Sequence, residues 1–138
     1  MGYSTNGIAL YNIINGLVAS TTLAIVYNYD VKEITKYPCA SISVKDGDEE
    51  ELDTQNNLLK TRYLIRVQDQ NVSVATMEAR MRTLCDAILA ELRKKANQTI
   101  SGNSVRILPF AVTWGWFEGQ LPTRMFEIQV EVQEYFAI

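Results

Sequence analysis

Residues 76–98, TMEARMRTLCDAILAELRKKANQ, decide the fold that the sequence predicts. Apolar side chains recur in this stretch at steps of three and four residues, which places them on one face of a helix. These side chains are Met77, Met81, Leu84, Ile88 and Leu92. At about 1.5 Å per residue the helix would be roughly 30 Å long, enough to lie across a small sheet. We interpret it as a scaffold and not as a site.

Length and composition are those of a globular protein. The chain has 138 residues, of which 47% are hydrophobic and 21% are charged. We therefore expect residues 1–138 to form a single α+β domain. The net charge of -3 argues against tight nucleic-acid binding, which usually relies on a basic patch. No stretch approaches the ~20 apolar residues of a membrane span, so we expect no membrane partner.

The residue types that usually carry catalysis are scarce. The sequence has no histidine, the commonest general base and metal ligand. We therefore expect no enzyme activity, no cofactor and no metal site. Cys39 and Cys85 form no CxxC pair, and two buried free thiols are favoured over a disulfide.

Two helices and about five strands follow from the hydrophobic pattern. The expected helices cover residues 6–20 and 76–98, and the expected strands cover residues 23–30, 40–44, 59–67, 105–112 and 126–132. Because consecutive strands mostly lack long crossovers, we expect a mainly antiparallel sheet with both helices packed on one face.

An acidic run separates two of the expected strands. It comprises residues 46–53 and includes Asp46, Asp48, Glu49, Glu50 and Glu51. Because dense like charges repel one another, we expect an exposed, mobile loop that closes a hairpin. The run does not match the EF-hand pattern, so calcium binding is the minor alternative. The loop is either simply hydrated or becomes ordered against a basic partner.

Two further groups are candidates for contact with a partner. Trp114, Trp116 and Phe117 form an aromatic run, which either packs in the core or forms an interface. Both tryptophans share a face if the run is extended. The second group is a basic row on one expected strand, formed by Lys60, Arg62 and Arg66. This row is either a hydrated sheet face or a partner for a neighbour's carboxylates.

The order of these elements resembles the tail terminator and tail-completion (neck) proteins of long-tailed bacteriophages. The matching stretches are residues 6–20, 40–67, 77–95 and 105–135. The resemblance implies a structural virion protein that forms a ring, expected to be a hexamer, at the head-proximal end of the tail. Such a ring ends growth of the tail tube and joins the tail to the head connector.

The resemblance also implies partners and a location. The partners are further copies of the chain, the tail tube protein and the head–tail connector or neck protein. DNA would pass through the ring without specific binding, which suits an acidic protein because phosphate is repelled. The protein would be assembled in the host cytoplasm and reside in the virion. The alternatives are a head-closure or minor tail protein or, in a different class, a small soluble ligand-binding domain or enzyme.

Overall fold

The computed structural model describes residues 2–52, 55–71, 73–100, 103–117 and 122–137. Asp53, the last carboxylate of the acidic run, lies outside these ranges. The elements in chain order are α1 (Tyr3–Asn15), β1 (Ile25–Tyr27), β2 (Cys39–Glu51), β3 (Asn56–Gln70), α2 (Val74–Arg93), a short 3-10 helix η1 (Lys95–Asn97), β4 (Thr99–Ile100), β5 (Asn103–Phe117) and β6 (Thr123–Ala137).

Long antiparallel strands make up most of the sheet, whose order is β1-β2-β3-β6-β5-β4. The central strands β3 and β6 pair along their full 15-residue lengths. β1 pairs in parallel with the start of β2, and the other pairs are antiparallel. The α+β class and the mainly antiparallel sheet are confirmed. The sheet has six strands where the sequence predicts about five, because the two-residue strand β4 forms an additional edge.

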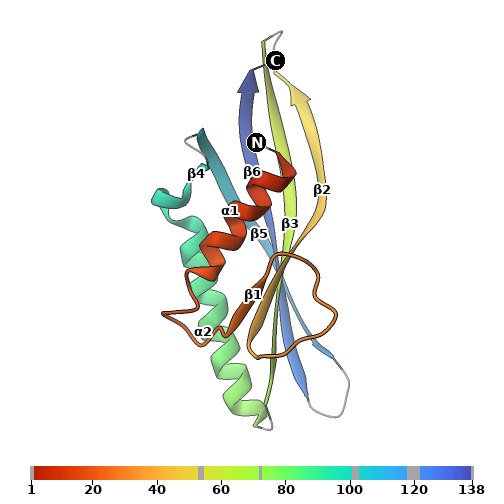
Figure 1. Cartoon of the computed structure of the whole chain (residues 1–138), viewed down its shortest axis with the longest axis vertical. Coiled ribbons are helices and arrows are strands. Elements are labelled where there is room, and N and C mark those ends of the chain that lie inside the picture. The colour runs from red at the N-terminus through yellow and green to blue at the C-terminus, as the bar shows by residue number, and fades with distance from the viewer. Residues whose placement is uncertain (1, 53–54, 72, 101–102, 118–121, 138) are drawn as a thin grey trace.

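Both helices cover the same face of the sheet, as the sequence predicts (Figure 1). The apolar stripe of α2 is buried, and Ser73 caps the helix by accepting a hydrogen bond from the Thr76 backbone N–H. Side chains on alternate positions of β3 and β6 meet this stripe, since successive strand residues point to opposite faces. They include Tyr63, Ile65, Val67, Phe126, Ile128, Val130 and Val132.

The first helix begins earlier and ends earlier than expected, at Tyr3 and Asn15. The Asn6 side chain is buried and donates to Glu134 Oε1 at 3.1 Å. The Tyr63 hydroxyl donates to the Tyr3 carbonyl at 2.6 Å. Gly7 allows a close approach, because a Cβ atom there would lie 3.3 Å from the Tyr63 ring. Contacts with the sheet therefore determine the residue at which α1 begins.

The acidic run is not a mobile loop over residues 46–51, and that prediction is wrong. These residues belong to β2 and pair with β3 from Asp46↔Arg62 to Glu51↔Asn57. A bulge between Val44 and Asp46 marks the point where the run begins. Residues 47–52, 56–60 and 133–137 form what we call the arm, which continues past the start of α1 (Figure 1).

We predict that Gly47→Ala lowers the free energy of unfolding by about 1–3 kcal/mol, the usual cost of overpacking. A Cβ atom at Gly47 would meet the Tyr3 ring and lie 2.9 Å from the Lys60 carbonyl oxygen. The backbone oxygen is held by the sheet and cannot move aside cheaply. Urea unfolding measures the change.

Gly16→Ala is the matched control for this prediction. At Gly16 the nearest atom to an added Cβ, the Ile13 carbonyl oxygen, lies at an ordinary 3.4 Å, and the backbone is right-handed helical. The free energy of unfolding of the Gly16→Ala variant is expected to stay the same or rise slightly, because alanine lowers the conformational entropy of the unfolded chain. Equal urea midpoints for the two variants would refute the close approach at Gly47.

Candidate functional site

Ion pairs cover the face of the sheet opposite the helices, and we call this array the charged ladder. Arg62 lies at its centre, donating to Asp46 and Asp48 at 2.9 Å each and to Glu131 at 3.1 Å. The hydrogen bonds that Arg62 donates, first to Asp46 and then to Asp48, raise the pKa of its guanidinium above the ordinary value. Two carboxylates of the acidic run are thus held in place by the opposite strand.

The rest of the predicted basic row is paired in the same way. Lys60 lies 3.7 Å from Glu50, and Arg66 lies 2.9 Å from Glu127. Arg66 also lies 3.5 Å from Asp30, beyond β1. On the face of the sheet opposite the helices, the cations of this row pair with carboxylates of their own chain, and this helps the acidic run to form a strand. Pairing of the row with a neighbour's carboxylates stays a prediction.

Glu49 and Glu51 differ from the other acidic candidates. They alternate with Asp48 and Glu50 along β2, so they lie on the helix side of the sheet. Both side chains are exposed. Neither has an ion-pair partner among the described residues. Among the described residues, the arm therefore presents these two exposed carboxylates without a cationic partner.

The aromatic run lies at the end of the sheet opposite the arm. Trp114 is half-buried and packs on Phe126, with ring centroids 4.9 Å apart. Trp116 and Phe117 are exposed by 47% and 41%. The alternatives that the sequence leaves open thus divide by residue, because Trp114 contributes to the core and the other two rings face solvent. The shared face of the two tryptophans is confirmed by their pairing with Phe126 and Arg124.

Arg124 joins the aromatic end to the second helix. Its guanidinium carbon lies 5.0 Å from the Trp114 ring centroid and 4.9 Å from that of Trp116. The same guanidinium donates to Glu78 of α2 at 2.8 Å and to the Gly115 carbonyl at 3.2 Å. These contacts hold the two tryptophan rings in a defined arrangement.

Sequence reasoning missed two buried carboxylates that fasten the helices to the sheet. Asp69 is fully buried and accepts from Arg80 of α2 at 2.6 and 2.8 Å. Glu134 is 2% exposed and accepts from Asn6 and from the Gly2 backbone N–H at 2.9 Å. The alternation along the strands could have predicted both, because each carboxylate lies two residues after the last buried apolar residue of its strand and so points to the same buried face.

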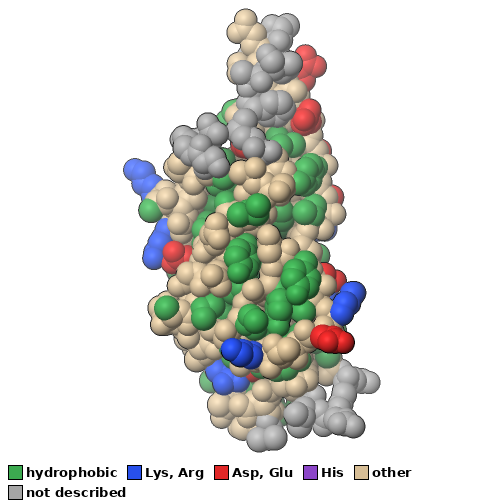
Figure 2. All heavy atoms as spheres, in the orientation of Figure 1, with side chains coloured by type: hydrophobic (Ala, Val, Ile, Leu, Met, Phe, Trp, Pro, Cys, Tyr) green, Lys and Arg blue, Asp and Glu red, His purple; other side chains and the backbone are tan. Residues whose placement is uncertain are grey.

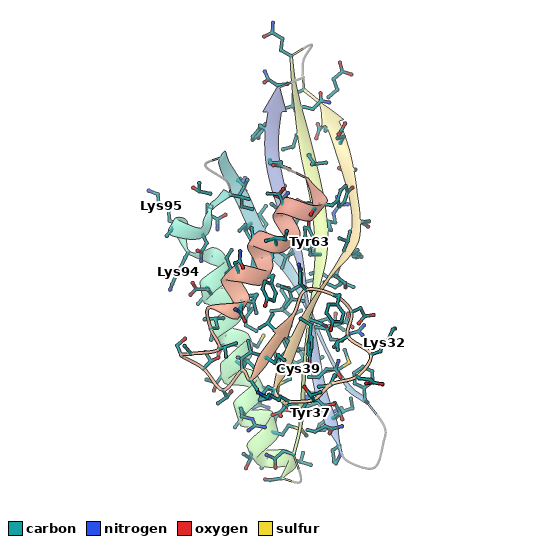
Figure 3. All side chains as sticks on the ribbon, viewed as in Figure 1. Lys32, Tyr37, Cys39, Tyr63, Lys94 and Lys95 are labelled. Carbon is teal, nitrogen blue, oxygen red and sulfur yellow. The ribbon has the colours of Figure 1, made fainter. Side chains whose placement is uncertain are left out.

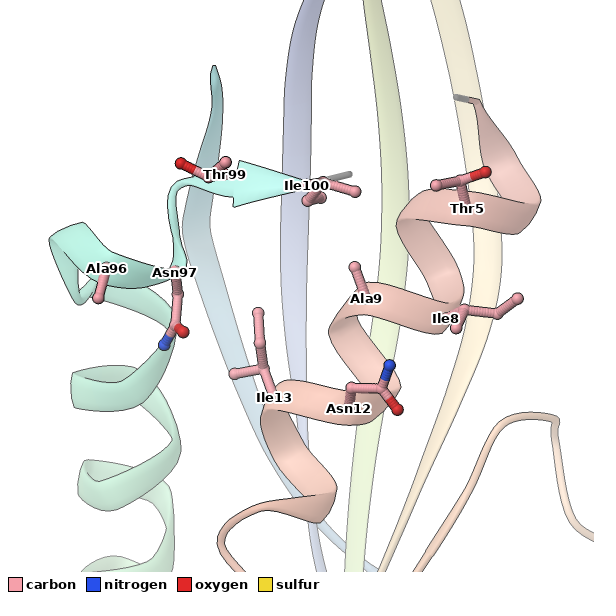
Figure 4. Close-up of a pocket in the computed structure, with 9 residues that line it drawn as sticks. All are labelled: Thr5, Ile8, Ala9, Asn12, Ile13, Ala96, Asn97, Thr99 and Ile100. Atoms are coloured by element: carbon pink, nitrogen blue, oxygen red, sulfur yellow. The ribbon is translucent and has the colours of Figure 1, made fainter. Parts of the chain in front are cut away.

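A groove runs between α1 and the segment that follows α2 (Figure 4). Its volume is about 360 Å³. The α1 wall includes Ile8, Ala9 and Ile13, and the opposite wall includes Ala96 and Ile100. A second hollow of about 670 Å³ lies between residues 20–22 and α2. Among the described residues that line it, the one charged side chain is Arg80, which is already paired with Asp69.

In the part of the chain that the structure describes, no three acidic, cysteine or histidine side chains come together as metal ligands would. No helix there has the length and apolar character to cross a bilayer.

Both cysteines are buried free thiols, as the sequence favours. Burial raises the pKa of Cys39 to about 11 and that of Cys85 to about 11. Both thiols therefore stay protonated near neutral pH, where the thiolate is the reactive form. This arrangement points to packing and not to redox chemistry.

Comparison with solved structures identifies a similar fold. One chain from the virion of a native gene transfer agent particle superposes with a TM-score of 0.63 at 14% sequence identity. The match covers 98% of this chain and 100% of that chain. At this identity the likeness shows a shared fold. A scan against protein families finds no match, and a search of the curated proteins finds none either.

We predict that Arg80→Ala destabilises the protein by about 3–5 kcal/mol, because it leaves the Asp69 carboxylate buried without its charge partner. Arg82→Ala on the same helix is the control. Arg82 is 71% exposed, and its one ion-pair partner among the described residues is Glu78, so its loss should cost less than about 1 kcal/mol. Urea unfolding of both variants measures the difference. Similar losses in the two would contradict the role assigned to Asp69.

We predict that a thiol reagent at pH 8 modifies the native protein slowly and the urea-unfolded protein rapidly at two thiols per chain. Raised pKa values also imply lower stability in alkali. Stability is unaffected below the ordinary thiol pKa of about 8.5 and falls as pH rises from there towards 11, because the unfolded state ionises first. Rapid modification of either thiol without unfolding would contradict this assignment.

Proposed function

We propose that this chain is a structural, non-enzymatic virion protein that forms a ring at the head-proximal end of a phage tail. The ring ends growth of the tail tube and joins the tail to the head connector. The observation that carries this proposal is the shared fold over nearly the whole length of a chain from a gene transfer agent virion. The element order, which resembles tail terminator and neck proteins, supports the finer assignment.

The two edges of the sheet support assembly into a ring. β1 pairs only with Cys39–Ser41 of β2, and β4 pairs only with Asn103–Ser104 of β5. The rest of β2 and the rest of β5 have no strand paired on their outer sides among the described residues. Exposed edges of this length normally need protection. A ring subunit can use two different lateral surfaces, since its contacts run head to tail around the axis.

The other proposed partners follow from the ring. The exposed aromatic rings Trp116 and Phe117 and the arm lie at opposite ends of the sheet. One end would meet the tail tube protein and the other the connector. We propose a hexamer whose lumen passes DNA without binding it. The net charge of -3 supports this, because an acidic surface repels phosphate.

The test combines the mass of the purified protein with electron microscopy of particles made without it. Light scattering coupled to size exclusion should give a closed oligomer, expected to be a hexamer. Particles lacking the protein should carry tails of uncontrolled length that are not joined to heads. Normal-length tails detached from heads would instead indicate head closure. A strict monomer, with normal particles in its absence, would refute the structural role.

A further inference from the structure

The outer edge of β5 is free over a stretch that carries no charge. Gln98 covers the start of this edge, because its two oxygens accept hydrogen bonds from the Val105 and Ile107 N–H groups. Beyond Pro109, no strand among the described residues pairs with the outer side of β5. Residues 110–117, FAVTWGWF, contain neither a charge nor a proline, the features that usually protect an exposed edge. This part of β5 is therefore suited to pair with another strand.

The outer edge of β2 is free beyond Ser41, where its pairing with β1 ends. The first part of this free edge is apolar. Val44 is 52% exposed and faces the helices, because it pairs with the buried Tyr63. The second part, residues 46–51, belongs to the acidic run. Two such acidic edges would repel each other, so the edge of β2 is better matched to a different strand.

A hollow of about 320 Å³ lies beside Val44 on the helix face of the sheet. Its walls include Tyr3 and Ile8 of α1 and Ile42 of β2. Tyr63 also lines it, next to α1 (Figure 3). Figure 2 shows hydrophobic side chains gathered over α1 and beside it. A strand added to the edge of β2 would direct alternate side chains towards this hollow, and an apolar side chain would fit there.

The side chains of β5 match the two parts of the β2 edge. Val112 is 36% exposed and lies on the helix face, because it pairs with the buried Ile128. Arg106 lies on the opposite face, since it pairs with Gln133, whose side chain donates to Glu131 of the charged ladder. Arg106 is exposed and has no ion-pair partner among the described residues. β5 thus has a cation near its start and apolar side chains towards its end.

The two free edges lie on opposite sides of the sheet and run in opposite directions, because each of the pairs from β2 through β3 and β6 to β5 is antiparallel. Rotation about an axis parallel to the strands brings β5 of one copy antiparallel to β2 of the next, with both helix faces on the same side. In this direction the apolar end of β5 meets the end of β2 at Val44, and Arg106 meets the end that carries the acidic run.

We infer that the free edge of β5 in one copy pairs with the free edge of β2 in the next copy and joins their sheets. Val112 packs against the hollow beside Val44. Arg106 adds a cation to the acidic run, where Asp46 and Asp48 share Arg62. This inference rests on the proposed ring and adds which surfaces meet. Because the two edges differ, the contact is head to tail and can be repeated around a closed ring.

A single glutamate in either edge tests the contact with the full chain. Val112→Glu on β5 and, separately, Val44→Glu on β2 each place a charge without a partner in the contact. Each should weaken self-association about tenfold or more, measured by sedimentation velocity. Val74→Glu is the matched control, because Val74 is 48% exposed at the start of α2 and belongs to neither edge. Its assembly should equal that of the unmodified protein, and circular dichroism shows whether each variant is folded.

A mixture of the two edge variants distinguishes this contact from a symmetric one. The Val44→Glu chain keeps an intact β5 edge, and the Val112→Glu chain keeps an intact β2 edge. Each variant alone should be monomeric, and the mixture should form heterodimers that grow no further. Pairing between two β5 edges is the competing arrangement. It would let the Val44→Glu variant dimerise alone.

Arg106→Glu gives a second measurement at an exposed position, where the substitution leaves the core unchanged. It should weaken assembly because like charges then face each other, and Arg106→Lys should assemble normally. Unchanged assembly of Arg106→Glu or of both edge variants would overturn the inference while leaving the proposed function standing. Dimers of Val44→Glu alone, or a mixture that stays monomeric, would overturn it as well. A monomeric unmodified protein would instead refute the proposed ring itself.

Discussion

The antiparallel pairing of β3 with β6 is the constraint on which the rest of the structure depends. The two strands pair over their full 15-residue lengths and lie at the centre of the sheet. Their alternation sends apolar side chains to one face, where α1 and α2 bury them, and polar side chains to the other. The same register carries Asp69 and Glu134 into the buried face, where each fastens a helix.

Charge is distributed unevenly over the sheet. In the charged ladder three cations pair with six carboxylates, so the ladder carries a net negative charge. Such exposed pairs contribute little stability individually. Their effect here is to allow a strongly acidic stretch to pair as a strand.

Local pattern predicted the elements well and their contacts poorly. The stripe from Met77 to Leu92 has a period that only a helix presents on one face, and the core face of α2 follows from it directly. The acidic run was predicted as a loop because its charges repel each other along one strand. The structure places Arg62 and Lys60 directly across from it. A prediction that considers only residues close in the chain cannot detect such cross-strand neighbours.

The sequence by itself determined the α+β class, the central helix, the alternating strands and the buried thiols, because periodicity and hydrophobicity act between residues close in the chain. Only the tertiary structure decided where α1 begins, which carboxylates are neutralised, and which aromatic ring is buried and which are exposed. These outcomes depend on residues far apart in the chain. Asn6 meets Glu134, and Glu78 meets Arg124. Such pairs exist only once strand register and helix packing have brought them together.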